Sequence, residues 1–190
     1  MEGDLSTEKL APLVALAILF VCAWTGEVRP AAAATKGEIA TEVGATVEKL
    51  YTQAPESRQL ANKAKGMLVF PSVKKGGLIV GGSYGEGALL IDNKPVAYYS
   101  TTSGSIGLQA GYQESSVVYM FMTDEALQKF RESSGWEVGG EASVAVIDTG
   151  STGKIESQTF DHPVVAFVFG ASGLMAGVSL EGSKISMLKE

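Results

Sequence analysis

The chain has 190 residues, of which 45% are hydrophobic and 19% are charged, a composition that excludes a disordered protein and is typical of one folded domain. The formal net charge of −6 argues against a general nucleic-acid-binding protein. Cys22 is the only cysteine, so no disulfide framework exists within the chain.

The first 34 residues read as a leader. Residues 11–24 are apolar and uncharged, which is short for a membrane-spanning helix and typical of the hydrophobic region of a signal peptide. The alanines at 32–34 offer a small-x-small cleavage pattern. We therefore expect residues 1–34 to be a signal peptide and the protein to be exported, either periplasmic or associated with the outer membrane. Two alternatives remain open: an uncleaved anchor, and lipidation at Cys22, for which Val21 is an unfavourable preceding residue.

Two helices are expected next. Apolar residues recur at three- and four-residue steps over residues 37–52, among them Val43, Val47 and Leu50, which predicts an amphipathic helix. Pro55 ends it and stands near the first turn of a second helix at about residues 56–65.

Strand-like runs dominate the rest of the chain. They lie at residues 66–70, 76–82, 86–91, 96–101, 105–112, 115–122, 142–147, 164–170, 173–180 and 184–188. The segment Asp92-Asn93-Lys94-Pro95 is a turn signal, and Thr123 is the expected N-cap of a mid-chain helix that ends near residues 133–135. This order predicts an α+β fold: a mainly antiparallel, Gly-rich curved sheet with N-terminal helices and one mid-chain helix.

A Gly-Leu-x-small-Gly motif occurs three times, as GLIVG at 77–81, GLQAG at 107–111 and GLMAG at 173–177. If each lies in a strand, its two glycines face the same side and permit a close backbone approach, so a side chain at Gly81, Gly111 or Gly177 would disturb folding. The sequence around the first and third copies is similar, which leaves open either an internal duplication or a chance likeness of Gly-rich strands.

Residues 81–85, GGSYG, match the nucleophile elbow of α/β-hydrolases, and Asp161 and His162 follow in the order of a catalytic triad. A serine hydrolase using Ser83 with His162 is thus the alternative function. Against it, a strand and not a helix follows Ser83. His162 is the only histidine, so no zinc cluster is expected, and we interpret it as a turn residue. We expect no metal, no cofactor and no enzyme activity.

No acidic residue occurs between Ser57 and Gly85, whereas this segment holds five basic ones, namely Arg58, Lys63, Lys65, Lys74 and Lys75. Such a local positive charge attracts anionic membrane surfaces. The alternative interpretation is a solvated surface that keeps the protein soluble.

The segments AKGMLVFPSVKKGGLIVGGSYGEGALL, SGSIGLQAGYQ, FMTDEALQKF, GWEVG and AFVFGASGLMAGVSLEGSKI, in this order, resemble the SYLF domain. Members of this family include bacterial exported lipid-binding proteins and actin-binding proteins of yeast. The resemblance covers about residue 36 to the C-terminus and implies that residues 35–190 are a non-catalytic domain. It also implies binding of anionic phospholipids, notably phosphoinositides, through basic residues and an amphipathic N-terminal helix. The basic region of the family corresponds best to Lys63, Lys65, Lys74 and Lys75. Actin binding belongs to the eukaryotic members, and the leader argues against it here.

Overall fold

The computed structural model describes residues 34–77, 80–106, 111–139, 143–149, 161–173 and 180–188. The leader expected at residues 1–34 lies outside the described residues, except for Ala34. The described residues all belong to one compact unit of the chain, Ala34–Glu190.

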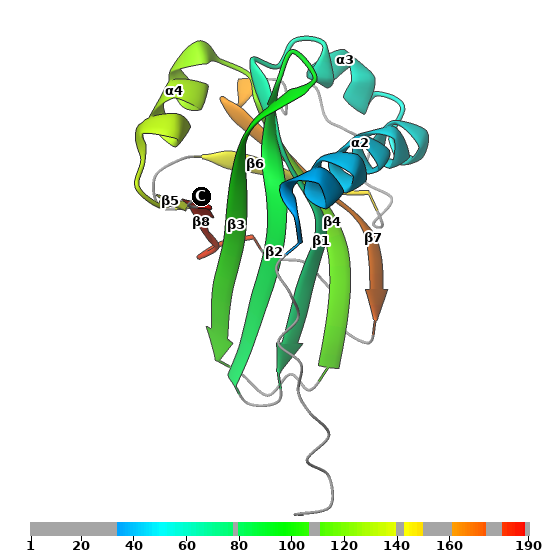
Figure 1. Ribbon diagram of the computed structural model, residues 1–190, viewed down its shortest axis with the longest axis vertical. Helices are drawn as coiled ribbons and strands as arrows, with labels where there is room; N and C mark the ends of the chain where they lie inside the picture. The colour runs from blue at the N-terminus through cyan, green and yellow to red at the C-terminus, as the bar shows by residue number, and fades with distance from the viewer. Residues whose placement is uncertain are drawn as a thin grey trace, which may run out of the picture. The chain divides into compact units, whose positions relative to one another are not determined.

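This unit combines helices with one sheet (Figure 1). Its helices are α2 (Lys36–Gln53), α3 (Ser57–Ala61) and α4 (Asp124–Glu132). Its strands are β1 (Gly66–Gly77), β2 (Val80–Ile91), β3 (Lys94–Ile106), β4 (Gly111–Phe121), β5 (Trp136–Glu137), β6 (Val144–Asp148), β7 (Val164–Gly173) and β8 (Lys184–Met187). The expected α+β class is confirmed, although the second helix is shorter than the residues 56–65 that the sequence predicts.

The strands form an eight-stranded sheet in the order β5-β8-β3-β2-β1-β4-β7-β6. All neighbouring pairs are antiparallel except β6 and β7, which are parallel. The turn between β2 and β3 falls where the sequence predicts it, with Asp92 and Asn93 at φ 50° and 59°. Asn and Asp tolerate this left-handed conformation, which type I′ hairpin turns require.

Both longer helices begin at side-chain caps. The Thr35 hydroxyl accepts a hydrogen bond from the backbone N–H of Glu38, whose carboxylate in turn accepts from the backbone N–H of Thr35. Thr123, the predicted N-cap, accepts from the N–H of Ala126 at 3.2 Å. Within the described ranges, no helix has both the length and the apolar character needed to cross a bilayer.

The sheet has an apolar core on each face. The outer face, which α2 and α3 cover, buries Val43, Leu50 and Leu60 against side chains such as Val69 of β1. The inner face packs against α4 and β5, where Phe130 meets the rings of Tyr99, Phe121 and Trp136 at centroid distances of 4.9, 4.8 and 5.5 Å.

A β-bulge interrupts β1 at Pro71. The register against both β2 and β4 shifts by one residue between Val69 and Val73. Proline is accepted at a bulge because it cannot donate to the strand ladder, and its carbonyl accepts a hydrogen bond from the Ser116 hydroxyl at 2.8 Å. The sequence predicts that the strand ends before Pro71, but β1 continues through it to Gly77.

At the bulge, the side chains of β1 that face inward change from even-numbered to odd-numbered positions. Leu68 and Phe70 face inward before Pro71, whereas Val73 and Lys75 face inward after it. Glycines of β2 fit against this bend: a Cβ at Gly87 would lie 2.0 Å from the Val69 carbonyl oxygen, and one at Gly85 would lie 2.7 Å from that of Ser72. The backbones of β1 and β2 therefore approach each other closely at Gly85 and Gly87, beside the bulge.

The placement predicted for the Gly-Leu-x-small-Gly motifs is wrong for the first copy. Gly77 ends β1 and pairs across the hairpin with Gly81 of β2, so the two glycines face each other from neighbouring strands. In the second copy, residues 107–110 lie outside the described residues, and Gly111 opens β4 opposite Gly77. In the first copy, the four-residue spacing between the glycines therefore spans the β1–β2 hairpin. The third copy, including Gly177, lies outside the described residues except for Gly173.

Candidate functional site

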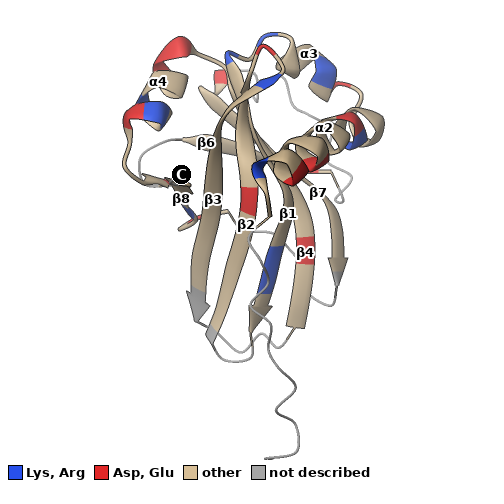
Figure 2. Cartoon of the chain, in the orientation of Figure 1, with Lys and Arg blue, Asp and Glu red and all other residues tan. Residues whose placement is uncertain are grey.

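The five basic residues of the acid-free segment lie in two separate places. Arg58 belongs to α3, and Lys63 and Lys65 follow it, whereas Lys74 and Lys75 lie in the far part of β1. Figure 2 shows this separation as blue around α3 and a single blue band on β1. Eight residues of strand between Gly66 and Lys74 correspond to roughly 25 Å. The segment thus does not form one continuous patch.

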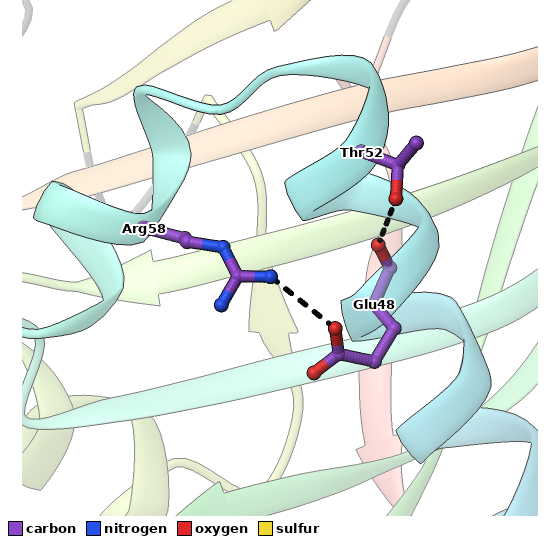
Figure 3. A network of polar contacts seen from close by, with 3 residues as sticks. All are labelled: Glu48, Thr52 and Arg58. Atoms are coloured by element: carbon purple, nitrogen blue, oxygen red, sulfur yellow. Dashed lines mark hydrogen bonds and ion pairs between the residues drawn. The ribbon is translucent and has the colours of Figure 1, made fainter.

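Carboxylates from elsewhere in the chain reach the first group. The Arg58 guanidinium lies 3.4 Å from the Glu48 carboxylate (Figure 3). It also lies over the Tyr51 ring, at 4.4 Å from the ring centroid. Lys65 lies 3.4 Å from the Asp124 carboxylate of α4. These ion pairs are exposed and contribute little to stability, but they reduce the positive charge that the sequence suggests for this surface.

Lys74 lies on the outer face, in register between Tyr84 and Glu114. The Glu114 carboxylate accepts hydrogen bonds from the hydroxyls of Ser72 at 2.5 Å and Tyr112 at 3.0 Å. The Ser72 bond is the main cause that lowers the pKa of Glu114, and the Tyr112 bond and the charges of Lys74 and Lys49 act in the same direction. The outer face here is therefore of mixed charge.

Tyr84, beside Lys74, donates its hydroxyl to Glu86 at 2.6 Å. This bond to a carboxylate, helped by partial burial and by the Glu86 charge, raises the pKa of Tyr84 to about 12. Glu86 also accepts from the backbone N–H of Ala34 at 3.2 Å, which fixes the chain just before α2.

Lys75 occupies the inner face, in register between Ser83 and Gln113. It lines a cavity of ≈ 30 Å³, which we call the inner cavity. The other side chains around it are Phe70, Val73, Ser83, Thr101, Ser103, Gln113, Ser115, Val117, Tyr119, Leu180 and Ser183. None of them is acidic. Sequence reasoning missed this site, whose only signal is that hydroxyl and amide residues alternate at 101/103 and 113/115.

The structure does not bring Ser83 and His162 together. The Ser83 hydroxyl is hydrogen-bonded to that of Ser103 at 2.7 Å, and a His162 ring nitrogen lies 3.5 Å from the Ser143 hydroxyl. Ser83 is opposite Lys75, while His162 precedes Val164, which pairs with Phe121 beside Gly66. These two places are about nine residues of strand apart, or ~30 Å.

The amphipathic character of α2 serves the core. Val43, Val47 and Leu50 are at most 8% exposed and pack against the sheet. While α2 is docked, its apolar side is covered, so these residues are not a membrane-facing surface in this structure. Within the described ranges, no group of three or more His, Cys, Asp or Glu residues could hold a metal ion.

Comparisons with known proteins agree with this fold and sequence pattern. The family described as "Las17-binding protein actin regulator" (Ysc84) matches residues 102–190. The human SH3 domain-containing YSC84-like protein 1 is 32% identical over 134 residues, and Protein YSC84 of Saccharomyces cerevisiae is 29% identical over 136 residues. Each match covers 67% of this chain but only 39% and 29% of the respective relative, so the chain corresponds to a minor part of their length. With its motifs in order and these relatives, the chain belongs to the SYLF (Ysc84) family.

Proposed function

We propose that this chain is a non-catalytic SYLF domain that binds anionic phospholipid head groups, including phosphoinositides. The observation that carries the proposal is the position of Lys74 and Lys75. Both lie in the part of the sheet away from α3 and α4, and neither forms an ion pair with another described residue. Arg58 and Lys65, by contrast, already face carboxylates.

Binding with α2 docked is the simplest form of this proposal, because the apolar side of α2 is buried. The basic side chains then make the contact by Coulombic attraction, at ~1 kcal/mol per Lys near an acidic membrane. This attraction weakens as salt rises, since the Debye length falls from ~10 Å at 0.1 M to ~3 Å at 1 M.

The test compares two variants that lose the same charge. Lys74→Gln/Lys75→Gln removes the β1 pair, and Lys63→Gln/Lys65→Gln removes the pair beside α3. In co-sedimentation with neutral and anionic vesicles at low salt, we expect the β1 variant to lose about tenfold or more in affinity, from ~2 kcal/mol. We expect the other variant to lose less.

Circular dichroism of both variants checks that they are folded. Equal losses would mean that only net charge matters. Full binding by both folded variants would reject the basic residues as the contact and direct attention to undocking of α2, which Val47→Asp would then probe.

The absence of catalysis is also a proposal, and Ser83→Ala tests it. A serine hydrolase would lose acyl-ester turnover by several orders of magnitude on this change. We expect no turnover in either protein, since Ser83 bonds to Ser103 and is far from His162. Robust wild-type turnover that Ser83→Ala abolishes would replace the binding function with an enzyme.

Export, with a final location in the periplasm or at the outer membrane, belongs to the same proposal. Mass spectrometry of the protein from its native host should find an N-terminus near Thr35. An intact Met1 in a cytoplasmic fraction would reject export, and a diacylglyceryl mass on Cys22 would replace cleavage near Ala34 with lipid anchoring.

The description of the family as an actin regulator supports a second candidate function, binding to an actin-associated partner or to actin. The leader argues against it. Co-sedimentation with filamentous actin decides: we expect the chain starting at Thr35 to remain in the supernatant.

A further inference from the structure

The inner cavity holds more buried polar side chains than the packing of the sheet requires. Thr101, Gln113, Ser115 and Ser183 are 5%, 4%, 7% and 5% exposed. They converge from β3, β4 and the segment before β8 on a space of ≈ 30 Å³, with the half-buried Lys75 beside it. The cavity therefore lies on the inner face of the sheet.

In the part of the chain that the structure describes, no partner uses the hydrogen-bonding capacity of these side chains. Among the described residues, only the Ser83–Ser103 pair of the cavity wall forms a side-chain hydrogen bond. None of Thr101, Gln113 and Ser115 bonds through its side chain to another described residue, and neither does Ser183. Buried polar groups are nearly always hydrogen-bonded, so such a cluster points to a polar guest.

The side chains that line the cavity favour a negatively charged ligand. Hydroxyls and an amide NH₂ donate hydrogen bonds, and Lys75 adds a positive charge. The described residues that line the cavity include no carboxylate to compete for Lys75 or to attract a cation. An oxyanion satisfies both the donors and the charge, in hydrogen bonds that are about twice as strong as neutral ones.

The size of the cavity selects which oxyanion fits. A volume of ≈ 30 Å³ accepts a small compact group and is too small for an acyl chain. A phosphodiester carries a substituent on both sides and cannot insert end-on, whereas a phosphomonoester presents three terminal oxygens.

We propose that the inner cavity receives the terminal phosphate of a phosphomonoester, with Lys75 as its counter-charge and Thr101, Gln113, Ser115 and Ser183 as hydrogen-bond donors. Two sources offer this group, a lipid head group and a free phosphomonoester. The inference rests on the proposed lipid function only where it names a lipid head group as the source of the phosphate.

Adjacent lysines on β1 supply a matched control, because Lys74 faces outward and Lys75 faces the cavity. Calorimetric titration with glycerol 3-phosphate uses the protein starting at Thr35. We expect Lys75→Gln and the nearly isosteric Thr101→Val to weaken binding roughly tenfold or more each, as expected for loss of a charge-assisted hydrogen bond. For this soluble ligand, Lys74→Gln should stay within about twofold of wild type, because Lys74 faces away from the cavity and its proposed contact is with a vesicle surface.

Three controls keep this test decisive. Circular dichroism checks folding, and Ser115→Ala replaces Thr101→Val if that variant does not fold. NMR should show that glycerol 3-phosphate shifts the Gln113 side-chain amide. Absence of binding by wild type, or equal loss in Lys74→Gln and Lys75→Gln, would overturn the proposal and leave the cavity to water.

Vesicle binding distinguishes the two sources of the phosphomonoester, a lipid head group and a free molecule. Phosphatidylcholine vesicles carry either phosphatidic acid, a phosphomonoester, or phosphatidylglycerol, a phosphodiester, at equal surface charge. A preference for phosphatidic acid over phosphatidylglycerol that Lys75→Gln abolishes supports the lipid head group, whereas Lys74→Gln should lower the affinity for both vesicles and keep the preference. Binding of glycerol 3-phosphate without any vesicle binding supports the cavity but rejects the lipid function. Equal binding to both vesicles, unaffected by Lys75→Gln, overturns the cavity proposal while the lipid function stands.

Discussion

The two halves of the long strands differ in what their side chains do. In the apolar half, Leu68, Phe70 and Leu89 and their neighbours are fully buried beneath helices on both faces. In the other half, beyond the bulge at Pro71, hydroxyls, glycines and the two lysines of β1 take their place; we call this the hydroxyl-rich half. One set of hydrogen-bonded strands thus carries stability at one end and a candidate binding site at the other, so changes at the two ends should have different consequences.

The largest expected effect is in the apolar half. Phe130 is 1% exposed and contacts three aromatic rings. We expect Phe130→Ala to lower the free energy of unfolding by about 3–5 kcal/mol, because the cavity left behind cannot collapse. Ser103→Ala in the hydroxyl-rich half should cost within about 1 kcal/mol, for one partly buried hydrogen bond. Urea denaturation measures both, and similar losses would contradict the division into halves.

The next effect concerns two glycines of neighbouring strands. A Cβ at Gly87 would collide with the backbone of Val69, whereas a Cβ at Gly104 would meet nothing within 4 Å. We expect Gly87→Ala to destabilise by about 3 kcal/mol through overpacking against an immovable backbone, and Gly104→Ala to change stability by within about 0.5 kcal/mol. Thermal unfolding followed by circular dichroism gives the comparison, and tolerance of Gly87→Ala would show that the bulge region is pliable.

The smallest expected effect is a change in tyrosine pKa, because a different cause raises the pKa of a tyrosine in each half. Burial raises the pKa of Tyr119 in the apolar half, whereas the bond to Glu86 is the main cause that raises the pKa of Tyr84 to about 12. The folded-state pKa of Tyr84 lies above its ordinary value of 10.0, so its contribution to stability is present below pH 10 and is lost as pH rises from there through about 12.

Glu86→Gln should therefore bring one tyrosine back toward an ordinary pKa and leave the buried ones unchanged. Ultraviolet absorbance of tyrosinate during a pH titration measures this, with Tyr84→Phe to identify the residue. An unchanged titration in Glu86→Gln would mean that the Tyr84–Glu86 bond is absent in solution.

Local patterns predicted most of the secondary structure. The α2 periodicity, the Thr123 cap and the Asp92–Asn93 turn each depend on residues close in sequence, and all three occur as expected. Proline has no N–H to donate to the strand ladder, so Pro71 predicts the end of a strand, but in the structure a β-bulge accommodates it. Apolar residues between glycines give no sign of where the chain reverses, so the sequence predicts a strand where the structure pairs Gly77 with Gly81 across a hairpin.

The candidate site was harder to predict, because its parts come from distant segments. An acid-free run of sequence suggested one basic patch, but Glu48 and Asp124 come to it from other helices. The sequence also gives no reason to distinguish the five basic residues, whereas alternation along β1 sends Lys74 and Lys75 to opposite faces. Only the strand order β3-β2-β1-β4 reveals that Thr101 of β3 and Gln113 of β4 line the same cavity as Lys75 of β1.

The bulge at Pro71 also determines where this protein can change in length. It adds one residue to β1 relative to both neighbouring strands, while the pairing on either side of it is regular. Deleting Pro71 would restore regular alternation with each half of the strand still facing as it does now, so that Lys75 keeps its inward position. Deleting Val73 instead would turn every later side chain to the opposite face and exchange Lys74 for Lys75. Loss of one residue at Pro71 should thus keep Lys75 facing inward, whereas loss of one residue at Val73 should turn it outward.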